Sequence, residues 1–254
     1  MPWVETASLS FVARHESGEA DAAAAVLEDL ERFRSRLEGA FARVPGEVAV
    51  VIHPRAAMLA LAAPWLPLAR AVSAPAGRRY FAGWFARQEI HVLSPAALEA
   101  RASGSPGSRT ALLRSPRHEY AHLVIGANDP RLPPPFSAQT FRRYVRAAWL
   151  CEGAATYLAG QVPHLGPAVA RRLREGATPG FPPTPKDALV LGGTVFALLE
   201  RERGVRACID LISAGAPVEP AAAIEQAFGR PLASVQRSWL DELESLSADS
   251  GGRF

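Results

Sequence analysis

The chain has 254 residues, 48% of them hydrophobic and 21% charged, values that are ordinary for a soluble globular protein and exclude an intrinsically disordered one. Its 28 basic and 25 acidic residues leave a net charge of +3, and Lys186 is the single lysine. The arginines are scattered, with Arg142, Arg143 and Arg146 the closest approach to a cluster, which argues against a nucleic-acid-binding protein.

The number of cysteines and the length of the apolar runs limit further which class of protein this chain can belong to. Cys151 and Cys208 are too few for a disulfide framework in a chain of this length. No apolar run approaches the roughly 18 residues that a membrane span needs. The first residues, Met1 to Glu5, lack the basic and apolar regions of an export signal. The sequence as written therefore predicts a cytoplasmic protein, or an exported one if a leader was removed.

The first third of the chain alternates strand-like and helical patterns. Residues 8–13 alternate in polarity like a strand, and residues 18–43 place apolar side chains on one helical stripe. Residues 48–52 form a continuous apolar run between turn signals, which predicts a buried strand. Residues 64–79 are rich in Pro, Ala and Arg and predict a loop with one short helix at most.

Two more strands precede a change of character in the chain. They are predicted at 80–85 and 89–93, and a breaker cluster at 103–108 then introduces helices separated by Gly and Pro. This layout predicts an α+β fold: a mixed α/β lobe with a small twisted sheet (residues 1–126) and a helical lobe (residues 127–254), together forming one domain. Long helices are expected at 109–125, 137–159 and 186–203.

The segment His118-Glu119-Tyr120-Ala121-His122 has the pattern H-E-x-x-H within a predicted helix. Because an α-helix has about 3.6 residues per turn, both imidazoles point the same way and can reach one metal ion. Glu119 then stands beside that ion, where a carboxylate can act as a general base. The alternative for the pentapeptide alone is a half-buried helix with two hydrogen-bonded histidines.

A catalytic zinc ion needs a third protein ligand and an open position for water. Glu152 is the best candidate, since it falls on the same helical stripe as Val145 and Ala155. A bound cation is one of the few partners that offset the desolvation of a carboxylate on an apolar stripe. A glutamate that reaches the helix edge is the alternative. Cys151 points about 100° away from Glu152 and is not expected to be a ligand.

The residues around Glu152, Trp149–Tyr157, read W-L-C-E-G-A-A-T-Y. Together with the preceding H-E-x-x-H pattern, this segment resembles the gluzincin metallopeptidases, particularly the bacterial peptidase MA-like group. In that group H-E-x-x-H is followed at about this distance by the pattern W-L-x-E-G-x-A-x-Y. Residues 192–199 and 227–239 resemble that family's closing helices more weakly.

The resemblance implies a zincin-like fold, Zn²⁺ as cofactor, and a peptide or protein substrate whose amide bond is hydrolysed. It makes His118, His122 and Glu152 the metal ligands and Glu119 the base that accepts the proton of the attacking water. Thr156 is expected to hydrogen-bond the nitrogen of a ligand histidine that points away from the metal, with Tyr157 beside it. A helix threonine that bonds its own backbone is the equal alternative for Thr156.

The resemblance is incomplete at the group that should hold the oxyanion. Such enzymes supply a Tyr or His from a later helix, yet no tyrosine follows Tyr157. The only later histidine, His164, falls in a predicted loop. The alternative function is therefore a non-catalytic zinc-binding module, and a third interpretation is a helical domain without metal.

A second carboxylate, Asp129, competes with Glu152 for the ligand role. A metzincin-like site places Gly three and a ligand six residues after the second histidine. Those positions are Ile125 and Asn128 here, while Gly126 and Asp129 each come one residue late. A slip of one residue redirects a side chain, so the spacing favours Glu152.

The resemblance also implies a place for an extended substrate. Zincins hold such substrates by strand addition, and the strand at 89–93 directly precedes the H-E-x-x-H helix. We expect this strand, with Ile90, His91 and Val92, to form the sheet edge beside the cleft. An interior strand is the alternative.

Overall fold

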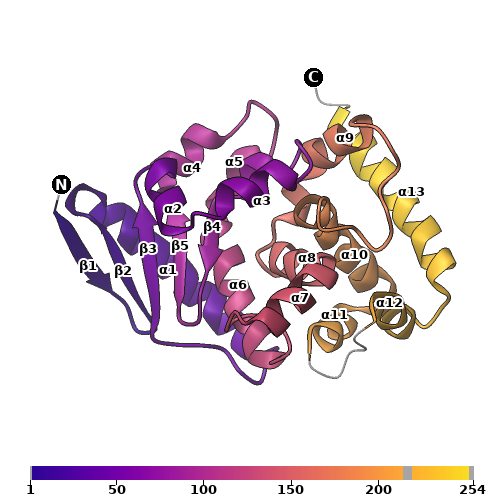
Figure 1. The fold of residues 1–254 in the computed structure, drawn as a ribbon, viewed down its shortest axis with the longest axis horizontal. Helices are drawn as coiled ribbons and strands as arrows, with labels where there is room; N and C mark the ends of the chain where they lie inside the picture. Colours follow the sequence, from indigo (N-terminus) through magenta and orange to yellow (C-terminus); the bar gives the residue numbers. More distant parts are fainter. Residues whose placement is uncertain (1, 214–218, 252–254) are drawn as a thin grey trace.

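The computed structural model describes residues 2–213 and 219–251 and has a mixed α/β fold (Figure 1). A five-stranded sheet lies at one end of the molecule, and the C-terminal helices lie at the other. Thirteen α-helices are present within the described ranges. Residues 214–218 and 252–254 of the predicted helical lobe lie outside them. None of the described helices is long and apolar enough to cross a membrane.

The sheet has the strand order β1-β2-β3-β5-β4, with β2, β3 and β5 parallel and the two outer strands antiparallel to their neighbours. The predicted strand at 8–13 begins later than expected, because Ser8 N donates a hydrogen bond to Phe11 O (2.8 Å) in the turn before β2. The strands are β1 Trp3–Ala7, β2 Phe11–Glu16, β3 Val48–His53, β4 Gly83–Phe85 and β5 Glu89–Leu93.

The predicted edge strand is an interior strand, so the expectation for Ile90, His91 and Val92 is wrong. β5 lies between β3 and β4 because the chain reverses through a hairpin, which places β4 antiparallel on the free edge. His91 is buried and stacks on Trp84 of that edge strand, with the two ring centroids 5.4 Å apart. The strand beside the cleft is therefore β4.

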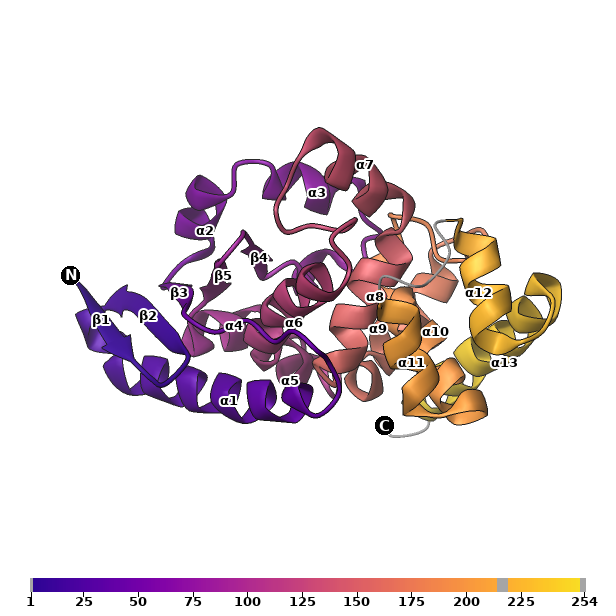
Figure 2. The same cartoon turned by 90° about the horizontal axis from the view of Figure 1, so that it is seen from below.

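Helices cover both faces of the sheet. α1 (Ala20–Glu38) and α6 (Ser115–Asn128) pack on one face, and α2 (Ala56–Ala62) packs on the other (Figure 2). α1 presents a stripe with helical spacing to the sheet. The buried members of that stripe are Ala23, Leu27, Leu30, Phe33 and Leu37.

Two predicted helices are each divided in the structure. The helix expected at 137–159 breaks at Ala147, whose backbone angles (φ −106°, ψ 26°) separate α7 (Ala138–Arg146) from α8 (Ala148–Leu158). The helix expected at 109–125 is divided at Arg114 into α5 (Ser108–Leu113) and α6. The predicted boundary between lobes, residue 126, falls inside the last turn of α6.

The remaining helices build the far end of the molecule and the rim of the sheet end. The predicted loop at 64–79 contains α3 (Leu66–Val72). One buried apolar cluster runs from Phe11 in β2 to Leu243 in the C-terminal helix, so both predicted lobes share a core. The other helices are α4 Pro95–Arg101, α9 Gly166–Arg174, α10 Ala188–Arg203, α11 Val205–Ile212, α12 Pro220–Phe228 and α13 Leu232–Gly251.

Candidate metal centre

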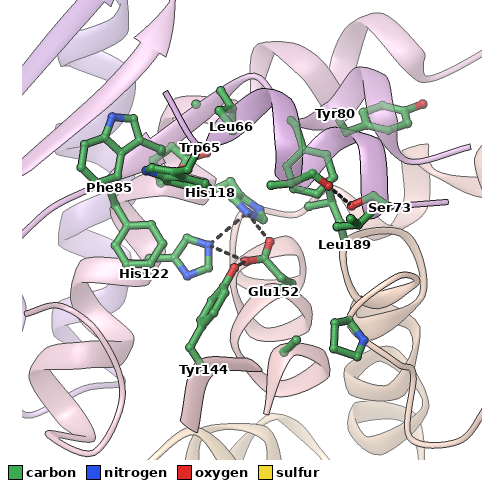
Figure 3. A pocket seen from close by; sticks show the side chains of 18 of the residues that line it. Trp65, Leu66, Ser73, Tyr80, Phe85, His118, His122, Tyr144, Glu152 and Leu189 are labelled. Atoms are coloured by element: carbon green, nitrogen blue, oxygen red, sulfur yellow. Dashed lines mark hydrogen bonds and ion pairs between the residues drawn. The ribbon is translucent and has the colours of Figure 1, made fainter. Parts of the chain in front are cut away.

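Helix α6 carries His118, Glu119 and His122 in the middle of the molecule, where it packs against β4, β5 and α8. All three side chains are buried, with 2–6% of their surface exposed. The helical spacing predicted from the sequence turns both imidazoles toward α8 (Figure 3). Phe85 of the edge strand stacks on the ring of His122, with centroids 4.1 Å apart, and fixes its plane.

Helix α8 brings Glu152 against the two histidines (Figure 3). Glu152 Oε2 lies 3.3 Å from His118 Nε2, and Glu152 Oε1 lies 3.5 Å from His122 Nε2. The two Nε2 atoms are 3.2 Å apart. One ligand atom from each residue falls within 4.8 Å of the others, so this buried group can hold a metal ion.

The ionisation of Glu152 and His122 suits a metal site, whereas the effect of burial on the pKa of His118 is outweighed by the carboxylates of Glu152 and Glu119, which raise that pKa. Burial raises the pKa of Glu152, but the neighbouring His122 and His118 and the hydroxyl of Tyr144 outweigh it and leave that pKa at about 2. Burial lowers the pKa of His122 to about 3. A carboxylate and a neutral imidazole are the forms that bind metal.

Gln161 supports His118 from behind, a role that the sequence assigned to Thr156 and Tyr157. Its Oε1 accepts a hydrogen bond from His118 Nδ1 (3.0 Å), and its Nε2 donates to Ala111 O (2.8 Å). This arrangement keeps the proton on Nδ1 and leaves Nε2 free for a metal. No spacing pattern pointed to Gln161, which follows α8 in a turn.

Thr156 and Tyr157 contact α10, and neither is bonded to His118, His122 or Glu152. Thr156 Oγ1 donates a hydrogen bond to Leu189 O in α10 (3.4 Å). The ring of Tyr157 stacks on Phe196, with centroids 5.6 Å apart. Both residues therefore join α8 to α10, the helix that packs along α8.

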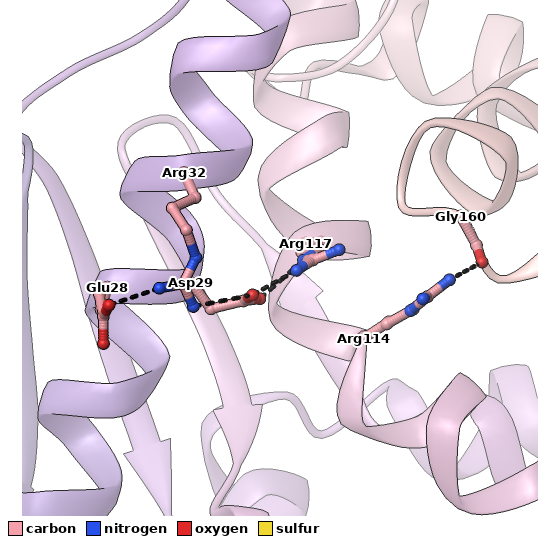
Figure 4. A network of polar contacts seen from close by, with 6 residues as sticks. All are labelled: Glu28, Asp29, Arg32, Arg114, Arg117 and Gly160. Atoms are coloured by element: carbon pink, nitrogen blue, oxygen red, sulfur yellow. Dashed lines mark hydrogen bonds and ion pairs between the residues drawn. The ribbon is translucent and has the colours of Figure 1, made fainter.

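Two arginines fix the start of α6 relative to its neighbours (Figure 4). Arg117 forms a bidentate ion pair with Asp29 of α1, in which Nε lies 2.6 Å from Oδ2. Arg114 donates a hydrogen bond to Gly160 O, next to Gln161. His118 and the side-chain amide of Gln161 that supports it are thus both held in place by contacts from the first residues of α6 and the residue before it.

Glu119 lies against the edge strand at the cleft. A Cβ atom on Gly83 would come within 2.7 Å of both Glu119 Cγ and Glu119 Oε1, so the glycine makes room for this carboxylate. Burial raises the pKa of Glu119 to about 8, although the neighbouring His118 lowers it. A carboxyl group with a pKa near neutrality is suited to exchange protons with a substrate.

Tyr144 supplies a hydroxyl group that the sequence reasoning missed. It comes from α7 and donates a hydrogen bond to Glu152 Oε1 (Figure 3). The resemblance placed this hydroxyl on a helix after Tyr157, whereas Tyr144 precedes Glu152 by eight residues and lies on the other side of the helix break at Ala147. His164, the histidine considered for this role, lies in a 3-10 helix outside the cleft lining.

Asp129, the competing ligand, is occupied elsewhere. Its carboxylate oxygens accept hydrogen bonds from Arg131 Nε (2.7 Å) and from a terminal guanidinium nitrogen of the same residue (2.8 Å). It is buried and is not part of the group that can hold a metal. Cys151 and Cys208 are free, buried thiols.

A cleft of about 390 Å³ opens onto His118, Glu119 and His122. Apart from these groups and Glu152, its walls carry no charged side chain. One wall comes from α3 and β4, and the other comes from α7 and the start of α10. Trp65, Trp84 and Phe141 also line a neighbouring recess, so the apolar wall extends past the cleft.

Compared with known proteins, the chain matches no family model and no curated protein. The likeness to gluzincins therefore rests on the sequence patterns around His118 and Glu152. What the site can do follows from its own residues and their geometry.

Proposed function

We propose that this protein is a zinc-dependent metallohydrolase of the zincin type that hydrolyses a peptide or amide bond. The observation that carries the proposal is the buried convergence of His118, His122 and Glu152 within 4.8 Å, with Glu119 beside them in an open cleft. Two imidazoles and one carboxylate form a common ligand set of catalytic zinc and leave a position for water. Zinc bound there would polarise the substrate carbonyl and acidify the attacking water.

The residues of the chain have separate tasks in this reaction. Glu119 accepts the proton of the attacking water and returns it to the leaving amine. Its burial raises the affinity of the carboxylate for that proton, while Gly83 lets it reach the cleft. Gln161 holds His118 in the tautomer whose Nε2 carries a lone pair.

Tyr144 is the residue we propose as the donor to the developing oxyanion. Its hydroxyl lies at the cleft, where it donates a hydrogen bond to Glu152. A preorganised hydroxyl stabilises the transition state more than the ground state, because the negative charge on oxygen grows during attack. With this assignment, the oxyanion donor comes from a tyrosine earlier in the chain, so none is needed after Tyr157.

The test of hydrolysis is the substitution Glu119→Gln. The amide keeps the shape of the side chain but cannot accept a proton, so turnover of a peptide library should disappear while zinc content stays near one per chain. The matched control is Glu244→Gln on the exposed face of α13, which should change neither quantity. If Glu119→Gln turns over substrate like the wild type, Glu119 is not the base. If the zinc-loaded wild type itself turns over no peptide, a non-catalytic zinc-binding module becomes the better assignment.

The substitution Tyr144→Phe tests the oxyanion role. Loss of one oxyanion donor should lower kcat about 100-fold while KM changes little, measured at saturating zinc. Tyr157→Phe is the control, since that ring lies against Phe196 and away from the ligands. A loss of activity that added zinc restores would show instead that Tyr144 only positions Glu152.

A further inference from the structure

Large apolar side chains are exposed together on one side of the molecule. Helices α2, α3 and α7 lie on that side, opposite α1 (Figure 2). Leu61 is 80% exposed, Leu68 67% and Phe141 54%. Leu68 and Phe141 line the same cleft, so α3 and α7 share one surface, and α2 lies on the same side of the molecule (Figure 2). We call this the α2–α3–α7 face, and its exposed apolar members are Leu61, Trp65, Leu68, Val72, Phe141 and Val145.

The two chain segments that build this face contain no acidic residue. Residues 48–88 and 130–151 hold nine of the 28 basic residues, so the rest of the chain has 19 basic and 25 acidic residues. Of these nine arginines, only Arg131 forms an ion pair with a carboxylate among the described residues. Arg142 and Arg146 are exposed on α7 beside the apolar side chains. Arg142 and Arg146 thus give this face positive charge, and the two segments that build it supply no carboxylate to balance them.

We infer that the α2–α3–α7 face docks on an anionic lipid surface. Exposed apolar side chains that can enter the boundary between headgroups and acyl chains, surrounded by arginines, are the pattern of interfacial binding. The helix α7 is amphipathic and has no buried residue, which leaves its apolar side chains available. The mouth of the metal cleft would then open toward the lipid.

The positive charge of the α2–α3–α7 face favours a lipid surface over a second copy of the chain or a nucleic acid. A second copy of the chain, packed face to face, would bring two sets of arginines together without carboxylates between them. A nucleic acid would meet the arginines but would gain nothing from Leu61 and Leu68. Large exposed apolar patches on soluble domains mark interaction sites, and only a lipid surface or an acidic apolar protein satisfies both features. A continuous lipid surface suits the broad spread of the patch over three helices.

The experiment is flotation of the full chain with vesicles of phosphatidylglycerol and phosphatidylcholine, compared with vesicles of phosphatidylcholine alone. The wild type should float with the anionic vesicles and lose binding as salt rises. The pair Leu61→Gln with Leu68→Gln should reduce partitioning about tenfold or more. Its control, Leu9→Gln with Val205→Gln, removes equally exposed apolar side chains elsewhere and should not.

The contribution of the arginines is tested by a second pair of substitutions with its own control. Arg142→Gln with Arg146→Gln should weaken partitioning about fivefold for each arginine removed, because each is worth roughly 1 kcal/mol near an anionic surface. Arg43→Gln with Arg237→Gln, exposed elsewhere, is the control. All variants change exposed residues, and an unchanged circular dichroism spectrum shows that they fold.

Four results would overturn the inference. The first three are failure of the wild type to float with anionic vesicles, an equal loss in the control pairs, and a dimer in sedimentation that Leu61→Gln with Leu68→Gln dissolves. Saturable binding to acidic polypeptide in preference to vesicles would also reject lipid as the occupant. Glu119→Gln should float like the wild type, so the inference stands or falls separately from hydrolysis.

Discussion

Three buried carboxylates near the centre of this molecule meet different partners and therefore have different roles. Glu152 faces two imidazoles, Glu119 faces the cleft beside Gly83, and Asp129 is bound by Arg131. A buried carboxylate is costly unless it is paired, so each partner indicates what its carboxylate does. Only Glu152 lies among atoms that can share a metal ion.

This separation predicts opposite outcomes for two alanine substitutions. Glu152→Ala should lower zinc affinity far beyond the 10–100-fold typical of a residue that only supports a ligand. Asp129→Ala should leave zinc affinity nearly unchanged and should instead lower stability, because it removes a buried carboxylate that accepts hydrogen bonds from Arg131. Competition with a chromogenic chelator measures affinity for both variants. An empty site in Asp129→Ala and a filled one in Glu152→Ala would refute the ligand assignment.

At the scale of elements, the metal site depends on how closely α8 and α10 cross. A Cβ atom on Gly192 would lie 2.7 Å from Trp149 O and 2.8 Å from Gly153 Cα. A Cβ atom on Gly153 would lie 2.5 Å from the carbonyl carbon of Gly192. The two glycines thus allow backbone contact between the helices, directly behind Glu152. Both glycines stand within the sequence patterns that resemble gluzincins.

We expect Gly192→Ala to separate these helices. Alanine favours a helix by about 1 kcal/mol, but the overlap with backbone atoms costs more, so the free energy of unfolding should fall by about 2 kcal/mol. Zinc affinity should also fall, since Glu152 moves with α8. Chemical denaturation and zinc titration measure the two effects. Gly104→Ala is the control, because a Cβ there meets nothing within 4 Å, and equal stability of the two variants would argue against a tight crossing.

At the scale of the whole molecule, the metal group joins two parts of the chain. His118 and His122 come from α6, which packs on the sheet, whereas Glu152 comes from α8, which packs on the C-terminal helices. An ion held by all three ties the sheet end to the helical end. The continuous core across both predicted lobes provides the same connection through apolar contacts.

Removal of zinc should therefore lower the melting temperature of the whole chain. At a free zinc concentration of about 100 Kd, binding to the native state alone adds about 2.7 kcal/mol of stability. Calorimetry with and without a chelator should show one transition that shifts by several degrees, and the Glu152→Ala variant should show no shift. A transition that divides in two without zinc would show that the lobes are coupled by the metal and not by their shared core.

The sequence by itself determined the residues of the candidate metal group and the place of Glu119 beside them, because these features depend on local spacing. His118, Glu119 and His122 point one way on any regular helix, and Glu152 on an apolar stripe needs a partner. The buried strands and the stripe of α1 were also local patterns. The helix breaks at Arg114 and Ala147 were not predicted, although Pro116 in the first turn of α6 marks the first of them; no Gly or Pro marks the second.

Tertiary structure decided which residues surround those ligands. Tyr144 and Gln161 reach the site because α7 and the turn after α8 fold over it, and no fixed spacing encodes such contacts. The sheet edge belongs to β4 and not to β5, because strand order depends on long-range pairing that a single sequence does not reveal. Thr156 and Tyr157 face α10 for the same reason: the partner of each helix face is chosen by packing across the whole chain.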